Sequence, residues 1–528
     1  MTQLLPFLDD EFMFLYADFE RGLCKPGPTE GCHTAVKRTL SRCDFRLRSI
    51  SRDFSCLVAV ALALLFRGIA TCEVTQQPTD ERATTPNCPL DPRPSYQFPF
   101  LRYDEDWSLL RCAPRTDRWD RIKYMPLGEG KTYLTIGGDV REVYESYDHQ
   151  YWGDGPQGQD GWLVHHYLLH GDLHVNPSLR VFGELQAAFE NGRNGGPRPY
   201  DEDKLDIHQA FVDFNCCCSP RKTTLRIGRQ ELYYGSGRLV DARFGLNTRI
   251  SFDGLKIIIP SKRSNTEIFA TRPTLLRPGI FDDPPDSKKW FWGIYNTTAV
   301  KPSVSLDLYY LGYKAASQTF ATGMGEFQSN TIGGRWAGKA GNHDFDEEAN
   351  VQVGTFKNGD IRAWSVALYN GYTFQRVSET PRVSLRSDAT SGDNDPNDRN
   401  LGSFFPIYAR GKYFGEADLN GPVNTIDIIP ALDLHPRSDL LINLSYGAFW
   451  RESIHDGIYG FAGNLYKPGD ESRARMIGQQ TEIDFNYFIM PHTLMRVVYQ
   501  HFFPGRFLKE TPPGQDVNYV TVWFDYHF

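Results

Sequence analysis

A stretch in the first half of the chain gathers residues that could bind an anion. Between Arg221 and Arg249 there are seven basic residues and two acidic ones, in a chain whose formal net charge is −8. The basic residues are Arg221, Lys222, Arg226, Arg229, Arg238, Arg243 and Arg249, and the acids are Glu231 and Asp241. Such a local excess of positive charge attracts anions, although a solvated loop is the simpler interpretation.

Patterns for catalysis or metal binding are weaker. Glu482 and Asp484 could act as acid and base in sugar cleavage, but carboxylates are expected in any wet interior. The acidic loop from Asp388 to Asp398 offers oxygen ligands for calcium, with a solvated loop as the simpler interpretation. The sequence has no serine-hydrolase, zinc-protease or P-loop spacing in a supporting context. We therefore predict no enzyme activity, no cofactor and no metal site.

The C-terminal residues indicate which elements must position these side chains. From Tyr519 to Phe528, apolar and aromatic residues alternate with Thr521, Trp523 and Asp525. This period of two would place one face against lipid and the other against a wet interior, as in the closing strand of an outer-membrane barrel. An edge strand of a β-sandwich is the alternative for these ten residues alone.

Turns and loops alternate along the chain. Five short breaks built on one proline are predicted to be tight hairpin turns, at Pro177, Pro220, Pro302, Pro436 and Pro491. Longer polar segments lie between them, at residues 191–204, 272–289, 391–422 and 467–472. Tight periplasmic turns and long extracellular loops are typical of outer-membrane barrels.

Eighteen segments have the alternation of strands. They begin near residues 132, 162, 179, 205, 223, 250, 265, 290, 303, 329, 345, 361, 381, 424, 438, 475, 493 and 517. An even number returns the C-terminus to the side where the first strand begins. The predicted fold is therefore all-β, a transmembrane antiparallel β-barrel of about 18 strands over residues 132–528, with 16 strands as the alternative.

Composition agrees with this fold class. Aromatic residues make up 14% of the chain, while its mean hydropathy is −0.45. A helical membrane protein would need apolar runs of about 18 residues, and none occurs after the N-terminal region. The negative net charge argues against a nucleic-acid partner.

The N-terminal region is predicted to have two parts. The apolar run at 57–66 follows several arginines and precedes small residues, which is the order of a secretory signal. We therefore expect a leader with a signal peptide over 1–72. Residues 73–131, rich in proline, arginine and aspartate, are expected to form a periplasmic lead-in with little core. The predicted location is the outer membrane, with its lipid as a partner.

Alternation also assigns charged strand residues to the lumen, because an arginine facing lipid near mid-bilayer costs about 2–4 kcal/mol. The predicted luminal cations are Arg141, Arg180, Arg226, Arg229, Lys256, Arg335, Arg382, Arg386 and Arg496. The predicted luminal acids are Asp139, Glu184, Glu190, Asp213, Glu231, Asp427, Asp433, Glu482 and Asp484. The two sets are equal in size, which favours a general porin for small solutes over a simple anion pore.

One conflict in parity falls within the basic stretch. Arg226 is luminal by the parity of its apolar neighbours, whereas the parity reverses from Leu232 onward. A β-bulge near Gly228 would resolve the conflict and turn Arg229 and Glu231 inward. The arginines that follow are expected at the extracellular mouth, namely Arg238, Arg243 and Arg249.

The same stretch carries a resemblance to a known family. RIGRQELYYGSGRLVDARFG followed by SFDG, then IRAWSVALYNGYTF, and then SFFPIYARGKYFGEADLNGPVNTIDIIPALDLHP resemble, in order, the alginate export family of outer-membrane barrels. The similarity runs from about Tyr133 to Phe528, and the chain departs from the family pattern at Leu246, where proline is expected. Matching positions are Arg226, Arg229, Gln230, Glu231, Gly235, Ser236, Gly237, Arg238, Arg243, Asn247, Arg249, Phe252, Asp253 and Gly254.

The resemblance implies an eighteen-stranded barrel and an arginine-lined conduit through which an acidic polysaccharide leaves the cell, with periplasmic export proteins as further partners. A general porin remains the alternative. The residues expected to line the pore or bind the anion are Arg141, Arg226, Arg229, Glu231, Arg238, Arg243, Arg249, Lys256, Arg335, Arg382, Arg386 and Arg496.

Overall fold

The computed structural model describes residues 98–128, 132–157, 161–216 and 222–528. The predicted leader, residues 73–97 and 129–131 of the predicted lead-in, Arg221 and the turn at Pro220 lie outside the described residues. Within them, no helix has both the length and the apolar character needed to cross a membrane.

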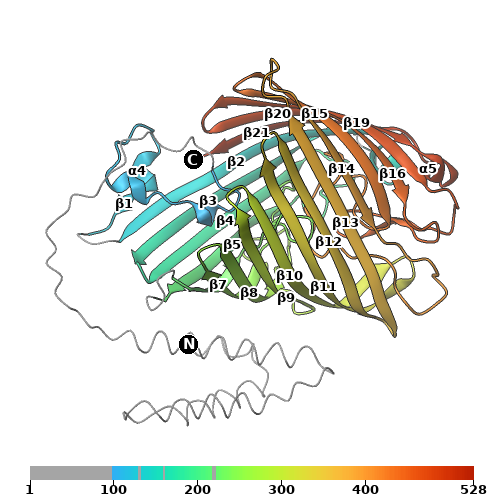
Figure 1. Ribbon diagram of the computed structural model, residues 1–528, viewed down its shortest axis with the longest axis horizontal. Coiled ribbons are helices and arrows are strands. Elements are labelled where there is room, and N and C mark those ends of the chain that lie inside the picture. Colours follow the sequence, from blue (N-terminus) through green and yellow to red (C-terminus); the bar gives the residue numbers. More distant parts are fainter. Residues whose placement is uncertain (1–97, 129–131, 158–160, 217–221) are drawn as a thin grey trace, which may run out of the picture. The chain divides into compact units, whose positions relative to one another are not determined.

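Eighteen antiparallel strands form one closed barrel (Figure 1). They are β2 (Tyr133–Asp148), β3 (Trp162–Asn176), β4 (Leu179–Asn191), β5 (Asp203–Asn215), β6 (Thr224–Gln230), β7 (Phe252–Pro260), β8 (Ser264–Pro273), β9 (Lys289–Lys301), β10 (Val304–Phe320), β11 (Gly323–Ala340), β12 (His343–Phe356), β13 (Gly359–Thr373), β14 (Arg382–Thr390), β15 (Thr425–Arg437), β16 (Leu440–Arg451), β19 (Met476–Met490), β20 (Thr493–Pro504) and β21 (Val517–His527). Each strand pairs with the next, and β21 pairs with β2 to close the barrel. The predicted fold class and strand count are confirmed.

Side chains alternate between the two faces of the barrel wall. In β21, Thr521 and Asp525 are buried in the interior, whereas Phe524 is 42% exposed on the outer face. In β10, Leu311 is buried and Leu308 is 55% exposed. An apolar outer face and a polar or aromatic inner face are what a lipid-spanning barrel requires.

The two ends of the barrel differ in their connections. At one end, two-residue turns join β3 to β4, β9 to β10, β15 to β16 and β19 to β20. Pro177, Pro302 and Pro491 lie in these turns as predicted, whereas Pro436 lies within β15 and the turn follows at 438–439. The first strand begins and the last strand finishes at this short-turn end. The opposite, long-loop end carries the connections 192–202, 231–251, 274–288, 391–424, 452–475 and 505–516. The fifth contains the hairpin β17 (Ile458–Tyr459) and β18 (Leu465–Lys467), and the last contains α5 (Arg506–Glu510).

Two of these connections fold into the barrel, and we call them the first luminal loop (231–251) and the second luminal loop (391–424). Leu232 and Val240 of the first loop are fully buried in a cluster with the inward-facing Phe291 of β9. Phe405 of the second loop belongs to the same cluster. The reversal of parity from Leu232 therefore marks the end of β6 at Gln230, where the chain leaves the wall.

The described part of the predicted lead-in packs on the barrel at its short-turn end. It contains η2 (Arg102–Asp104), η3 (Ser108–Arg111), α4 (Asp120–Lys123) and β1 (Met125–Pro126), which pairs with the start of β2. Tyr103 is buried against the inward-facing Phe182 and Phe211. The buried side chains of this segment are thus covered by the barrel interior.

Candidate functional site

The luminal loops are held to each other by backbone hydrogen bonds across the barrel interior. The amide of Asp241 donates to the carbonyl oxygen of Tyr408 at 2.9 Å, and the amide of Tyr408 donates to that of Leu239 at 3.0 Å. The amide of Arg410 likewise donates to the carbonyl oxygen of Gly237 at 3.0 Å. The two loops therefore form one body inside the barrel.

The wall holds this body from several sides. Arg141 of β2 donates to the carbonyl oxygen of Phe244 at 2.8 Å, and Tyr147 of the same strand donates to that of Ala417 at 3.0 Å. The side-chain amide of Gln352 in β12 donates to the carbonyl oxygen of Phe405 at 3.1 Å. That of Gln480 in β19 donates to the carbonyl oxygen of Phe414 at 2.6 Å. Because such backbone groups are satisfied by inward-facing side chains, the loops have a defined position in the lumen.

Most strand cations predicted to be luminal do face the interior, and each is paired with a carboxylate. Arg226 binds Asp213 through two bonds of 2.8 and 2.9 Å, and Lys256 lies 3.3 Å from Glu267. The remaining pairs are Arg141–Asp525, Arg180–Asp172, Arg335–Asp307, Arg335–Asp346, Arg382–Asp344, Arg382–Asp433, Arg386–Asp388, Arg496–Glu416 and Arg496–Asp484. Each of these cations is therefore neutralised by at least one carboxylate.

Arg229 corrects the prediction of a bulge near Gly228. The pairing of β6 with β5 and β7 continues without a shift through Gly228 and Arg229, so Arg229 stays on the outer face. It lies at the end of its strand, where its guanidinium bonds to Asp253 at 3.0 and 3.1 Å and to the carbonyl oxygen of Asp283 at 2.8 Å. An arginine at the rim, neutralised in this way, avoids the cost of mid-bilayer exposure that suggested an inward orientation.

The bulge occurs one strand away. In β5, Gln209 pairs with Glu184 and Ile207 pairs with Leu185, so His208 is the extra residue. Gly228 of the neighbouring strand approaches β5 closely, because a Cβ at Gly228 would lie 2.2 Å from the carbonyl oxygen of Ala210. The bulge in β5 re-aims residues of β5 only and does not account for the parity of β6, where the predicted bulge is absent.

Arg238 and Arg249 do not form an exposed ring at the mouth. Arg238 lies inside the lumen, 2.7 Å from Asp346 and 3.2 Å from Glu348. Arg249 is 1% exposed and lies 3.5 Å from Glu231. Arg238 thus fixes the first luminal loop to β12, whereas Arg249 joins the two ends of this loop and also lies 3.5 Å from Asp139 of β2.

Arg243 and Arg410 are different from the other luminal arginines. Among the described residues, no carboxylate lies within 4.0 Å of either guanidinium, and the Nε of each has no hydrogen-bond partner. Arg243 instead lies 5.1 Å from the ring centre of Phe461, and Arg410 lies 5.2 Å from that of Tyr413. Burial lowers the pKa of both groups, yet arginine remains charged in proteins. Each luminal loop thus carries one cation that has no carboxylate partner among the described residues.

A narrow cavity remains where the loops meet the wall. Its volume is about 20 Å³, about enough for one water molecule. Its charged lining consists of Arg141, Glu145, Arg198, Lys412 and Asp418. The Glu145 carboxylate is shared, at 2.6 Å from Arg198 and 3.2 Å from Lys412. Burial raises the pKa of Asp418 to about 7, so this carboxyl changes charge near neutral pH.

A larger cavity opens toward the short-turn end. It has a volume of about 470 Å³ and is lined by the turn at Pro302 and by the inward-facing Arg335, Asp346 and Tyr369. The described lead-in segment occupies another part of this end. The guanidinium of Arg226 lies 4.2 Å from the ring centre of Tyr103, and the Tyr103 hydroxyl donates to the carbonyl oxygen of Glu231 at 3.1 Å.

Two other expectations can be compared with the structure. Residues 394–400 of the acidic loop are exposed, and their aspartates accept backbone amide hydrogen bonds, as Asp395 does from Asn397 at 3.1 Å. At the departure from the family pattern, the amide of Leu246 donates to the carbonyl oxygen of Arg243 at 2.9 Å. Proline could not make this bond, because it has no amide hydrogen.

Several residues of the interior were missed from the sequence. Arg410 and Lys412 lie in a segment that was expected to be an outer loop, and Arg198 lies in another. Arg102 comes from the lead-in, yet it pairs with Glu105 and Asp139 and donates to the carbonyl oxygen of Phe528 at 2.9 Å. The available signal was the aromatic content of 404–414, which is high for a solvated loop.

Comparisons with known proteins agree with this architecture. The alginate export family matches residues 132–522. The crystal structure of Pseudomonas aeruginosa OccD3 (OpdP) has a TM-score of 0.52 at 11% identity, covering 77% of this chain and 93% of that one. That of Acinetobacter baumannii OccAB2 also has a TM-score of 0.52 at 11% identity, covering 75% and 98%. At such identities these structures show the fold alone.

No curated protein matches the sequence. The family match covers most of the chain, and the closed barrel with its apolar outer face agrees with it. The chain belongs to the alginate export family and is a channel-type β-barrel of the outer membrane.

Proposed function

We propose that this channel exports an acidic polysaccharide, with its long-loop end facing the outside of the cell. The observation that carries the proposal is the location of Arg243 and Arg410. They are cations without carboxylate partners among the described residues, and they lie on the loops that narrow the lumen. An anionic chain that reaches them is attracted by their uncompensated positive charge.

The paired charges on the inner face of the wall suit the passage of a polymer. The inward-facing Arg226, Arg335 and Arg496 of the wall are already paired with carboxylates, so a passing carboxylate would bind them weakly and leave again. Many weak contacts permit conduction, whereas a few strong ones would trap the polymer. The luminal loops are hydrogen-bonded to each other and to the wall inside the barrel, so passage of a polymer requires them to move.

A planar-bilayer measurement tests the proposal. At low salt the wild-type protein should pass anions in preference to cations, and less so as salt screens the charges. Arg243→Gln with Arg410→Gln should reduce the anion preference severalfold. Arg272→Gln is the matched control, because this arginine stacks on Trp290 at the outer rim, 4.1 Å from the ring centre. Alginate oligomers should block the current, whereas neutral dextran of similar length should not.

A general porin for small solutes is the second candidate, favoured by the paired charges of the wall. A wild-type channel that is unselective or cation-selective at low salt, and that alginate does not block, would support the porin and refute the export channel.

A further inference from the structure

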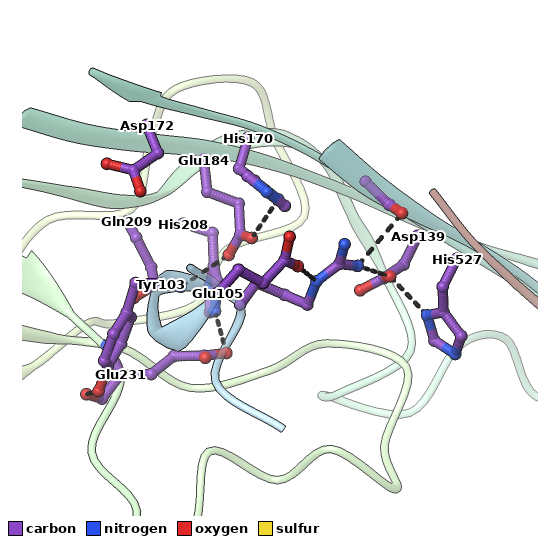
Figure 2. A network of polar contacts seen from close by, with 12 residues as sticks. Tyr103, Glu105, Asp139, His170, Asp172, Glu184, His208, Gln209, Glu231 and His527 are labelled. Atoms are coloured by element: carbon purple, nitrogen blue, oxygen red, sulfur yellow. Dashed lines mark hydrogen bonds and ion pairs between the residues drawn. The ribbon is translucent and has the colours of Figure 1, made fainter. Parts of the chain in front are cut away.

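Four inward-facing side chains of two kinds converge beside the first luminal loop. His170 of β3 and Glu184 of β4 are direct cross-strand partners, and His208 is the bulged residue of β5. Glu231 follows the end of β6, at the start of the first luminal loop. None of the four is more than 3% exposed. Figure 2 shows them approaching one another from separate elements.

The contacts within this cluster bring its donor atoms close together. His208 Nε2 lies 2.8 Å from Glu231 Oε1, and His170 Nδ1 lies 3.7 Å from Glu184 Oε2. One donor atom from each of Glu184, His208 and Glu231 lies within 4.8 Å of the other two. In a tetrahedral zinc site with bonds of about 2.0–2.2 Å, donor atoms are roughly 3.3–3.5 Å apart. Small side-chain rotations would therefore suffice to close the site.

Unsatisfied atoms point to a missing positive charge. Glu184 Oε2, Glu231 Oε2 and His170 Nδ1 are buried without a hydrogen-bond partner among the described residues. No lysine or arginine of the described chain lies within 4.0 Å of the Glu184 carboxylate. Buried carboxylates are costly unless they are paired or bind a metal.

The nearest cations are only partly available to this cluster. Arg249 lies 3.5 Å from Glu231 and also 3.5 Å from Asp139. Lys123 lies 3.2 Å from Glu105, which also pairs with Arg102. Asp139 and Glu105 thus compete for the cations of this region, and the charges of Glu184 and Glu231 are incompletely neutralised.

Gln209 holds the cluster in place from the same bulge. Its side-chain nitrogen donates to Glu184 Oε1 at 2.8 Å, and its side-chain oxygen accepts the amide of Glu231 at 3.1 Å. One oxygen of Glu184 is thereby occupied while the other remains free to bind an ion. Supporting contacts of this kind orient the ligands of metal sites in proteins.

We propose that Glu184, His208 and Glu231, with His170 as the fourth ligand, bind one divalent transition-metal ion. Imidazole nitrogens and carboxylate oxygens together suit zinc and its first-row neighbours better than calcium or magnesium. The ion connects Glu231, at the start of the first luminal loop, to strands β3, β4 and β5 of the wall. The proposal contrasts with the expectation from sequence of no metal site, and it is independent of the transported substrate.

Zinc retention by purified, folded protein tests the site. The tag is removed, metals are stripped with EDTA, zinc is added, and bound zinc is measured after dialysis. Wild-type protein should retain about one zinc per chain. Glu184→Gln and His208→Gln should each weaken zinc binding at least tenfold in competition with a chelating dye. Cobalt substitution should give the visible absorption of a tetrahedral nitrogen–oxygen site.

His166→Gln and Glu348→Gln are the matched controls, because both residues are buried and inward-facing but lie outside the cluster. Heat modifiability in gels confirms that every variant is folded, and Glu231→Gln replaces any variant that is not. The proposal is overturned if folded wild type retains no zinc, in which case a proton on Glu184 replaces the ion. It is equally overturned if the controls lose zinc to the same extent as the cluster variants.

Discussion

At the scale of single residues, the lumen is organised by arginines that share carboxylates. Arg226 shows why position matters more than charge. Its guanidinium lies between the rings of Tyr103 and Phe211, 4.2 and 3.8 Å from their centres, and binds Asp213 through two bonds. Planar stacking and a two-point bond are properties of arginine that lysine lacks. Arg226 therefore joins the lead-in segment to the wall, and its guanidinium is already occupied by these contacts.

Arg226→Gln should lower the free energy of unfolding by about 3 kcal/mol, because it leaves Asp213 buried without its main partner. The loss is at the lower end for a broken buried pair, since Arg180 remains 3.6 Å from Asp213. Arg229→Gln at the rim should cost under about 1 kcal/mol. Urea unfolding in detergent measures both, and an equal or larger loss at Arg229 would contradict the assignment of Arg226 to the interior.

At the scale of elements, the luminal loops control what the barrel can pass. Hydrogen bonds of their backbone to each other and to side chains of three strands explain how chain segments without regular structure stay ordered inside a wide barrel. The narrow cavity between them and the wall has both signs of charge. The net charge of the cavity lining depends on Asp418, whose two carboxylate oxygens have no hydrogen-bond partner among the described residues.

Anion preference should fall as pH rises from about 6 to 8. The pKa of Asp418 is raised to about 7 by burial, so its carboxyl is neutral at the lower pH and negative at the higher. The added negative charge repels anions at the constriction. Asp418→Asn should abolish this dependence in bilayer recordings. Asp283→Asn is the control, because burial also raises the pKa of Asp283 to about 7, but outside the narrow cavity. If the control removes the pH dependence and Asp418→Asn does not, the constriction lies elsewhere.

At the scale of the whole molecule, the two ends of the barrel have different tasks. The short-turn end carries the lead-in segment, which binds the C-terminus, because Lys123 donates to the carbonyl oxygen of Phe528 at 2.9 Å. The long-loop end carries every connection that folds into or over the lumen. In Figure 1, α4 and the C-terminus accordingly lie at the same end of the barrel.

Epitope tags test the direction in which the barrel is inserted. A tag within residues 395–398 should be accessible on intact cells, because this tip of the second luminal loop is exposed while its flanks are buried. A tag between Ser438 and Asp439 in the opposite turn should become accessible only after the outer membrane is permeabilised. The reverse labelling would invert the proposed orientation.

The sequence alone predicted the barrel wall in detail. All eighteen strands begin within six residues of the expected positions, with the largest difference at β11, which begins at Gly323 instead of near 329. Alternation also placed Arg226, Arg335 and Arg496 inside. This success has a local cause, since a strand between lipid and water must alternate polar and apolar side chains along its own length.

Contacts between distant segments determined the rest. The folding of 391–424 into the lumen depends on partners on β2, β12 and β19, far away in sequence. Arg229 faces outward because Asp253 and the loop at Asp283 neutralise it at the rim. His208 joins Glu184 and Glu231 because β5 bulges at this residue in its pairing with β4. A local period assigns each residue to a face, but the burial and pairing of a loop charge depend on which other segments the closed barrel brings beside it.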